Sequence, residues 1–211
     1  ATAAVALQRL IEEDPLYAER QVGIVDLDGN AASHTGSGCV PWAGGVTGDG
    51  YAIQGNCLTG AEVVDTMEQA WRSLPAEAPL QDRLITALAA GDAAGGDRRG
   101  RQSAAILVVR EGAGLGGEDD IAVDLRVDDH DAPIDELLRL LDLHELYLTA
   151  STEDDKVVVD DALRNELEAF AAAEGQRDFT TWVGVNNYEM RVARDLAWID
   201  ERILGIVRGD G

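Results

Sequence analysis

The order of its apolar runs most constrains what this 211-residue chain can fold into. Between two pairs of strand-like runs, residues 59–71 and 80–88 repeat apolar side chains at helical spacing. The first pair flanks Asp28-Gly29, a step that favours the positive dihedrals of a tight hairpin turn. Antiparallel sheet covered by helices satisfies both periodicities, so we predict an α+β fold. The strand-like runs are residues 21–26, 31–35, 103–110 and 121–127.

Helical patterns stand at both ends of the chain. Residues 3–13 form the first, which stops at Asp14-Pro15 because the residue before proline avoids helical dihedrals. The glycine-dense residues 36–50 read as a loop that leads into a short strand at 51–54. After residue 132 helical periodicity prevails, and we predict domains at 1–132 and 133–211, the second small and helical. Its expected helices cover residues 134–148, 160–173 and 198–207.

The charge balance excludes whole classes of partner. Forty acidic residues stand against 17 basic ones, which gives a net charge of −23, and Lys156 is the one lysine. Nucleic acids and anionic membranes both need a basic surface, so we expect neither as a partner. The acidic residues spread from Glu12 to Asp210, which favours adaptation to high salt over an acidic docking face. At molar salt the Debye length is only about 3 Å, so self-repulsion is screened.

Cysteine usage and hydropathy point to the cytoplasm. Cys39 and Cys57 are the only cysteines, too few for a disulfide framework in a chain of this length. No apolar run approaches the roughly 20 residues that span a bilayer. Residues 1–15 lack the basic start and apolar centre of a signal peptide. We expect no cofactor.

An arginine-rich loop, residues 94–103, is the strongest concentration of positive charge in this acidic chain. Among its glycines, guanidinium groups could form bidentate hydrogen bonds to the carboxylate or phosphate of a small anionic molecule. The same arginines could instead form internal salt bridges, which is the more ordinary use. The candidate ligand-binding residues here are Arg98, Arg99, Arg101 and Gln102.

A second group of candidates lies between the first hairpin and residue 56. His34 and Thr35 offer a base and a hydroxyl, and Cys39 follows in the glycine-dense loop, but the spacing matches no Cys-His protease motif. Gln54 and Asn56 place two amides around a glycine, where they could stabilise an oxyanion or simply cap a turn. We take His34, Thr35 and Asn56 as catalytic candidates and Gln54 as a ligand-binding candidate.

The acidic run DLRVDDH, residues 124–130, is dense enough in oxygen ligands to suggest a divalent cation. Its spacing matches no known metal loop, and Arg126 lies in its middle. Ion pairing between its aspartates and the arginine-rich loop is the favoured alternative, and we predict no metal site.

Five segments together resemble one family, the domain-of-unknown-function 1028 family, whose members are often labelled fimbrial or pilus assembly proteins. They occur in the family's order across about residues 3–147. The resemblance implies a four-layer αββα sandwich similar to N-terminal-nucleophile (Ntn) hydrolases, which cleave amide bonds with an N-terminal Thr, Ser or Cys. The segments are RQVGIVDLDGNAASHTG, VPWAGG, QGN, AGGDRRGRQSAAILVV and DLRVDDHDAPIDELLRLL.

Residues 150–208 resemble the small helical domain that often follows, described as peptidoglycan-binding-like. Family members normally extend further at the N-terminus, so the first part of the sandwich is expected to be missing here, and Ala1 carries no nucleophilic side chain. Two hypotheses follow. The chain is an amidohydrolase for a small anionic substrate, or it is a noncatalytic ligand-binding or assembly module. Assembly into a homo-oligomer is compatible with either.

Overall fold

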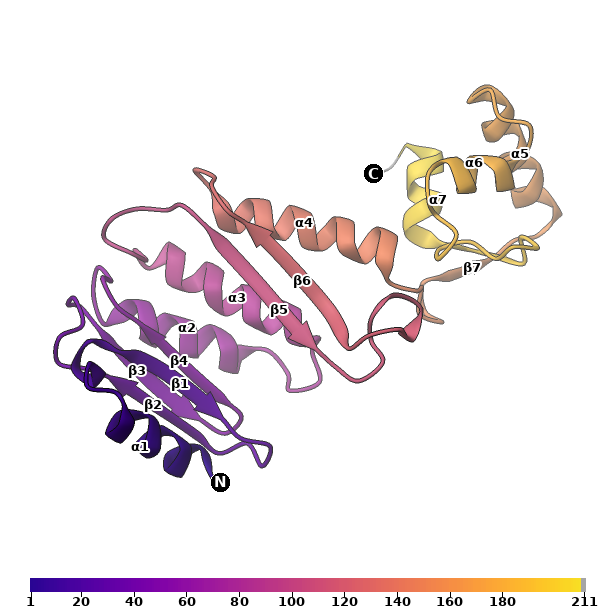
Figure 1. Ribbon diagram of the computed structural model, residues 1–211. Helices are drawn as coiled ribbons and strands as arrows, with labels where there is room; N and C mark the ends of the chain where they lie inside the picture. The colour runs from indigo at the N-terminus through magenta and orange to yellow at the C-terminus, as the bar shows by residue number, and fades with distance from the viewer. Residues whose placement is uncertain (210–211) are drawn as a thin grey trace. The chain divides into compact units, whose positions relative to one another are not determined.

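The computed structural model describes residues 1–209, which form two compact units. Residues 1–111 and 120–138 make up the first unit, and residues 112–119 with 139 onward make up the second. The predicted boundary between residues 132 and 133 stays a prediction, and the units divide within helix α4 (Pro133–Leu148). The other elements of the first unit are α1 (Ala3–Glu13), η1 (Tyr17–Glu19), β1 (Gln21–Val25), β2 (Ala31–Thr35), β3 (Gly44–Gly48), β4 (Tyr51–Gly55), α2 (Glu62–Ser73), α3 (Leu80–Ala93), β5 (Ala104–Val109) and β6 (Ile121–Val127) (Figure 1).

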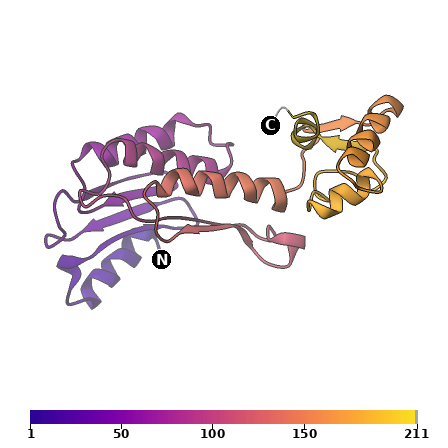
Figure 2. The same ribbon diagram turned by 90° about the horizontal axis from the view of Figure 1, so that it is seen from above.

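The first unit is α+β, as predicted, and all of its strand pairs are antiparallel hairpins. The hairpin β1–β2 contacts the hairpin β3–β4, with α1 against the first and α2 against the second. Figure 2 shows α1 on one side of these hairpins and α2 and α3 on the other. The two turns meet where Gly50 N donates to Gly29 O at 2.8 Å, so the strand ends at Gln21 and Thr35 lie at the opposite, open end.

Glycines allow the two hairpins to approach closely. Gly23 of β1 pairs with Ser33 of β2, and Gly45 of β3 pairs with Gln54 of β4. A β-carbon on Gly23 would lie 2.4 Å from Oε1 of Gln54, so a side chain at this position would force the Gln54 amide to move. The glycine here therefore serves the close contact between the hairpins rather than a turn.

Strand β3 corrects the expectation that residues 36–50 are a loop. Its sequence is GGVTG, and Gly44 and Gly45 pair with Gly55 and Gln54 in a regular register. Three of its five residues have no side chain, so an alternation of apolar and polar residues could not reveal it. The segment is a strand because its backbone pairs with β4, although its glycines disfavour sheet.

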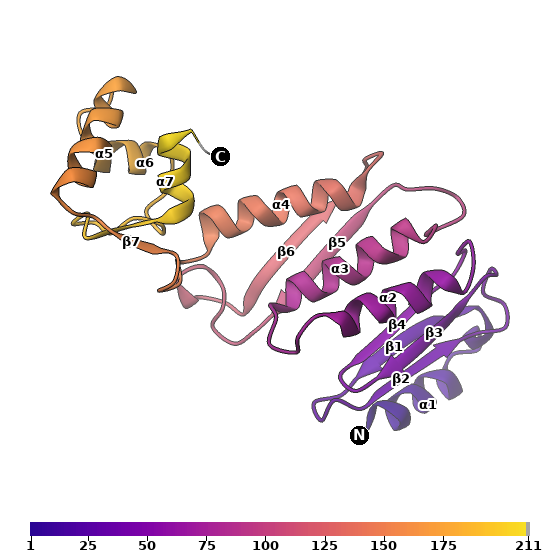
Figure 3. The same cartoon turned by 180° about the vertical axis from the view of Figure 1, so that it is seen from behind.

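The core of the first unit lies between the second hairpin and its helices. Trp71 of α2 packs beside Tyr51, whose hydroxyl donates to Glu68 at 2.6 Å. Seen from behind, α2 and α3 run side by side (Figure 3). Ile106 and Val108 of β5 are buried, whereas Leu107 and Val109 point the other way and are each 60% exposed. The buried cluster consists of Ile53, Leu58, Val63, Val64, Trp71 and Ala87.

The second unit is mainly helical but also contains a small sheet. Residues 198–200 were predicted to begin a helix, yet they pair as β8 with β7. Helix α7 begins only after Asp200, whose side chain accepts from Arg202 N at 2.9 Å and so caps it. The core surrounds Phe179 and Leu167. The elements are α4 from residue 139, η2 (Leu115–Gly117), β7 (Lys156–Val158), α5 (Asp161–Ala173), α6 (Phe179–Val185), β8 (Trp198–Asp200) and α7 (Glu201–Arg208).

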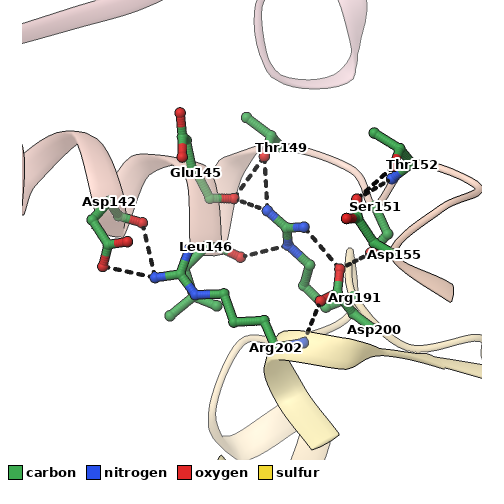
Figure 4. A network of polar contacts seen from close by, with 10 residues as sticks. All are labelled: Asp142, Glu145, Leu146, Thr149, Ser151, Thr152, Asp155, Arg191, Asp200 and Arg202. Atoms are coloured by element: carbon green, nitrogen blue, oxygen red, sulfur yellow. Dashed lines mark hydrogen bonds and ion pairs between the residues drawn. The ribbon is translucent and has the colours of Figure 1, made fainter. Parts of the chain in front are cut away.

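A buried ion pair organises the second unit (Figure 4). Arg191 is 7% exposed and Asp200 is 2% exposed, and Nη1 of the arginine lies 2.9 Å from Oδ2 of the carboxylate. The guanidinium also donates to the carbonyls of Glu145 and Leu146 in the last turns of α4. Ser151 donates to the same carboxylate. Within residues 1–209, no helix is long and apolar enough to cross a membrane.

Candidate functional site

Two of the three predicted catalytic residues meet at the open end of the stacked hairpins. Gln21, the first residue of β1, joins them through its side-chain amide. Its Nε2 donates to Oγ1 of Thr35 at 3.0 Å, and its Oε1 accepts from Nδ2 of Asn56 at 3.1 Å. Nε2 also lies within hydrogen-bond distance of the carbonyls of Gly55 and Gly44, at 2.8 and 3.2 Å. Gln21 therefore fixes the position of the hydroxyl and the second amide.

His34 lies on the other face of β2. Its Nε2 is 2.9 Å from the carbonyl oxygen of Tyr17, on the side of the hairpin that α1 and η1 occupy. Neighbouring residues of a strand point to opposite faces, so the imidazole cannot share a pocket with the Thr35 hydroxyl. The structure brings Thr35 and Asn56 together and leaves His34 apart from them.

The space between the hairpins is polar where an apolar core would be usual. Oγ of Ser33 and Oε1 of Gln54 are buried there without a hydrogen-bond partner among the described residues. Buried polar atoms normally find a partner, which can be an ordered water. Gln54, a ligand-binding candidate, therefore faces the space between the hairpins rather than the arginine-rich loop.

The arginine-rich loop docks beside this open end. Asp97 forms an antiparallel bridge with Leu58, and Arg98 N donates to Cys57 O at 2.8 Å. Thr59 N donates to Gly96 O at 3.0 Å. Cys57 directly follows Asn56, whose side-chain amide Gln21 holds. The loop is therefore hydrogen-bonded to the residue next to that amide. Backbone hydrogen bonds therefore join residues 57–59 to residues 96–98. We name residues 54–59 and 95–99, together with Gln21 and Thr35, the open-end site.

Aspartates of the loop and its flank neutralise two of the three candidate arginines. Arg99 pairs with Asp97 at 2.6 Å, and Arg101 pairs with Asp92 at 2.7 Å. The hydrogen bonds from Arg99 lower the pKa of the Asp97 carboxyl. Internal pairing was the favoured expectation, but its partners are not the predicted aspartates of the run 124–130.

Arg98 differs from its neighbours. Its guanidinium is exposed and makes no hydrogen bond or ion pair with any residue between 1 and 209, acting on Asp97 only through space. Gln102 is exposed as well, and its carbonyl accepts from His130 N at 2.9 Å. The candidate best placed to meet an anion is therefore Arg98.

Arg126 and Asp128 of the acidic run 124–130 line a separate cavity of about 390 Å³. Arg126 pairs at 2.7 Å with Asp128 of the same run. Across the described chain, no three His, Cys, Asp or Glu side chains gather in a way that could hold a metal ion. The other residues of the wall are Leu88, Ser103, Ala104, Ala105, Val127 and Ile134.

Gln21 and Ser33 are the site residues that sequence reasoning did not identify. Neither belongs to a motif, and a glutamine at the start of a strand is unremarkable by itself. The hairpin register could have identified them, because it places Gln21 opposite Thr35 and Ser33 opposite Gly23. Counting back from the Asp28-Gly29 turn would have put these polar residues on the face that Thr35 shares.

Comparison with known proteins places this geometry in a family. A crystal structure of a Silicibacter pomeroyi protein assigned to DUF1028 resembles the chain with a TM-score of 0.59 and 31% sequence identity. The match covers 69% of this chain and 61% of that one, so this chain spans less than two thirds of the solved structure. A search of the curated proteins finds no match. The family model of DUF1028, a family of unknown function, matches residues 1–137, and the chain therefore belongs to that family.

Proposed function

We propose that this chain binds a small anionic molecule at the open-end site, with Arg98 as the principal ligand-binding residue. The observation that carries the proposal is that the guanidinium of Arg98 has no ion pair within residues 1–209, whereas the other two arginines of the loop are paired. The hydrogen bond from Arg98 N to Cys57 O anchors this residue beside Asn56. An anchored backbone lowers the entropy lost when the side chain engages a ligand.

The chemistry of the site selects the ligand class. A guanidinium presents a planar fork that matches a carboxylate or a phosphate, and such charge-assisted hydrogen bonds are about twice as strong as neutral ones. Asn56 and Thr35 add an amide and a hydroxyl to the same surface. With a net charge of −23, the protein repels anions at a distance, so a short-range pairing must supply the affinity.

Calorimetric titration tests the proposal with two probes, inorganic phosphate and succinate, at constant ionic strength in KCl. We expect the wild type to bind at least one of them. Arg98→Ala should weaken binding roughly tenfold or more, because a charged hydrogen-bond partner contributes about 1.5–3 kcal/mol. Arg9→Ala is the matched control, since it removes an equally exposed arginine from α1 and should leave affinity unchanged.

Gly95→Ala provides a second variant that changes no charge. A β-carbon there would lie 2.4 Å from Oγ1 of Thr59, and the φ of +118° already disfavours any side chain. The substitution should displace the loop and weaken binding as Arg98→Ala does. Failure of both probes to bind the wild type, or equal affinity in Arg98→Ala, contradicts the proposal.

Amide hydrolysis is the second candidate function. In residues 1–93 the order of contacts runs from α1 through two hairpins to α2 and α3, which supports the αββα layering of Ntn-like hydrolases. Thr35 supplies a hydroxyl held beside two amides, but it accepts from an amide rather than facing a base. Thr35→Val should abolish amine release from carboxylate-bearing amides under this hypothesis, whereas the Arg9→Ala control should leave it unchanged. Unchanged release would exclude Thr35 as the nucleophile.

The remaining expectations concern salt adaptation, cellular location and the assignment of the C-terminal residues. Lysine depletion and the spread of acidic residues over both units support adaptation to high salt. We keep the cytoplasm as its proposed location, because two unpaired cysteines suit a reducing compartment. The peptidoglycan-binding-like assignment of residues 150–208 rests on the sequence resemblance.

A further inference from the structure

A small pocket opens on the second unit, lined by residues 180–194. Its volume is about 130 Å³, which equals the space of about four water molecules. Val183 of α6 and Val192 form a buried apolar floor. A molecule with a short aliphatic group fits this space. The lining residues are Thr180, Val183, Glu189, Val192, Ala193 and Arg194.

The segment that forms one wall is held in a defined backbone conformation. Val192 forms an antiparallel bridge with Ile199, and Ala193 N donates to Trp198 O at 3.0 Å. Arg191 between the wall residues is anchored by its buried pairing with Asp200. A wall fixed in this way does not need to be ordered by a ligand, so less of the binding energy is lost.

Two residues that line the pocket carry opposite charges. Glu189 and Arg194 are exposed, and within residues 1–209 neither forms an ion pair or a side-chain hydrogen bond, with each other or with another residue. Other arginines of this unit are engaged. Arg164 donates to the carbonyl of Leu196 at 3.0 Å, and Arg177 pairs with Asp178 at 2.7 Å. Arg194 therefore differs from Arg164 and Arg177 in that its guanidinium has no bond to another described residue.

We propose that the pocket binds a small zwitterion, a free α-amino acid with a short aliphatic side chain. Its ammonium group meets Glu189, its carboxylate meets Arg194, and its side chain lies against Val183 and Val192. A ligand that carries only one charge satisfies one rim residue and faces like charge at the other. The site requires both charges of the ligand together with its apolar group, and it is independent of Arg98.

Titration with L-alanine, followed by the methyl resonances of Val183 and Val192, tests this inference. We expect saturable shifts with L-alanine, and affinity at least about tenfold lower for propionate and ethylamine, which each lack one charge. Glu189→Gln and Arg194→Gln should each weaken L-alanine binding by a similar factor. Glu174→Gln removes an exposed carboxylate outside the pocket and should change nothing.

Three results would overturn the inference: no shift with L-alanine at millimolar concentration, equal binding of propionate or ethylamine, or unchanged affinity in both rim variants. Glu189 and Arg194 are exposed, so both variants should retain the wild-type circular dichroism spectrum and melting temperature. Arg98→Ala should leave L-alanine binding intact, which separates this site from the proposed anion site.

Discussion

Asp26 links the first turn of α1 to the turn of the first hairpin through a single carboxylate. Oδ2 accepts from Ala3 N at 3.0 Å, and Oδ1 accepts from the backbone of Asp28 and Asn30. The bond from Ala3 N is the main reason that the pKa of Asp26 lies below its ordinary value, and the bonds from Asn30 and Asp28 add to it. A helix N-terminus and a carboxylate also attract each other electrostatically.

This pKa shift predicts an acid-dependent loss of stability. The folded-state pKa lies below the unfolded value of about 3.9, so the contribution is present above about pH 4 and is lost as pH falls through the folded-state pKa. Asp26→Asn should lower the midpoint of urea unfolding at pH 7. The difference in midpoint between the wild type and this variant should be smaller at pH 3. A difference that stays constant across this range would show that the charge of Asp26 is not involved.

At the scale of elements, the end of α4 depends on one buried arginine. Arg191 supplies donors to the carbonyls of Glu145 and Leu146, which have no partner inside the helix, and it neutralises Asp200. Asp200 in turn caps α7. The pair therefore connects α4, β8 and α7 within the second unit.

Arg191→Met should destabilise the second unit by about 3–5 kcal/mol, because it leaves the Asp200 carboxylate buried without a cation. Amide hydrogen exchange across α5 and α7 measures this loss directly. Arg202→Ala is the control: its pairing with Asp142 is solvent-exposed and should contribute no more than about 1 kcal/mol. Adding Asp200→Asn to Arg191→Met should recover part of the loss, and no recovery would contradict the role of the unpaired charge.

Elements with a distinct local signal could be predicted from the sequence. Alternation marks β6, a compact apolar run marks β5 and the Asp28-Gly29 turn marks β1 and β2, whereas GGVTG of β3 has too few side chains to show a pattern. Likewise, α6 is only seven residues long, and its periodicity is too brief to detect.

In the candidate site too, some features could be predicted from local sequence and others could not. Thr35 and Asn56 were both predicted as site residues, and the Asp28-Gly29 turn places Thr35 opposite Gln21. Gln21, which joins them, required knowledge of the stacking of the hairpins. The partners of Arg99 and Arg101 depend on the path of the loop, which local residue patterns do not specify. Strand alternation could have separated His34 from Thr35 beforehand.

The charge of the whole molecule leads to a prediction about salt. Forty acidic and 17 basic residues give a net charge of −23, and most of the ion pairs are exposed at the surface, where each contributes little. Repulsion among the unpaired carboxylates therefore destabilises the folded chain in dilute buffer. Raising ionic strength from 0.1 to 1 M shortens the Debye length from about 10 to about 3 Å and removes most of this repulsion.

We therefore expect the melting temperature to rise with KCl, mainly below 1 M, by about 2–4 °C for each kcal/mol of repulsion that is screened. Differential scanning calorimetry in KCl and in potassium sulfate at equal ionic strength separates two causes. Screening depends on ionic strength alone, whereas exclusion of sulfate from the protein surface strengthens apolar burial in any protein. Equal curves in the two salts would assign the stabilisation to screening. A melting temperature that does not change in KCl, or one that rises only in sulfate, would show that the carboxylates are not spaced closely enough to repel.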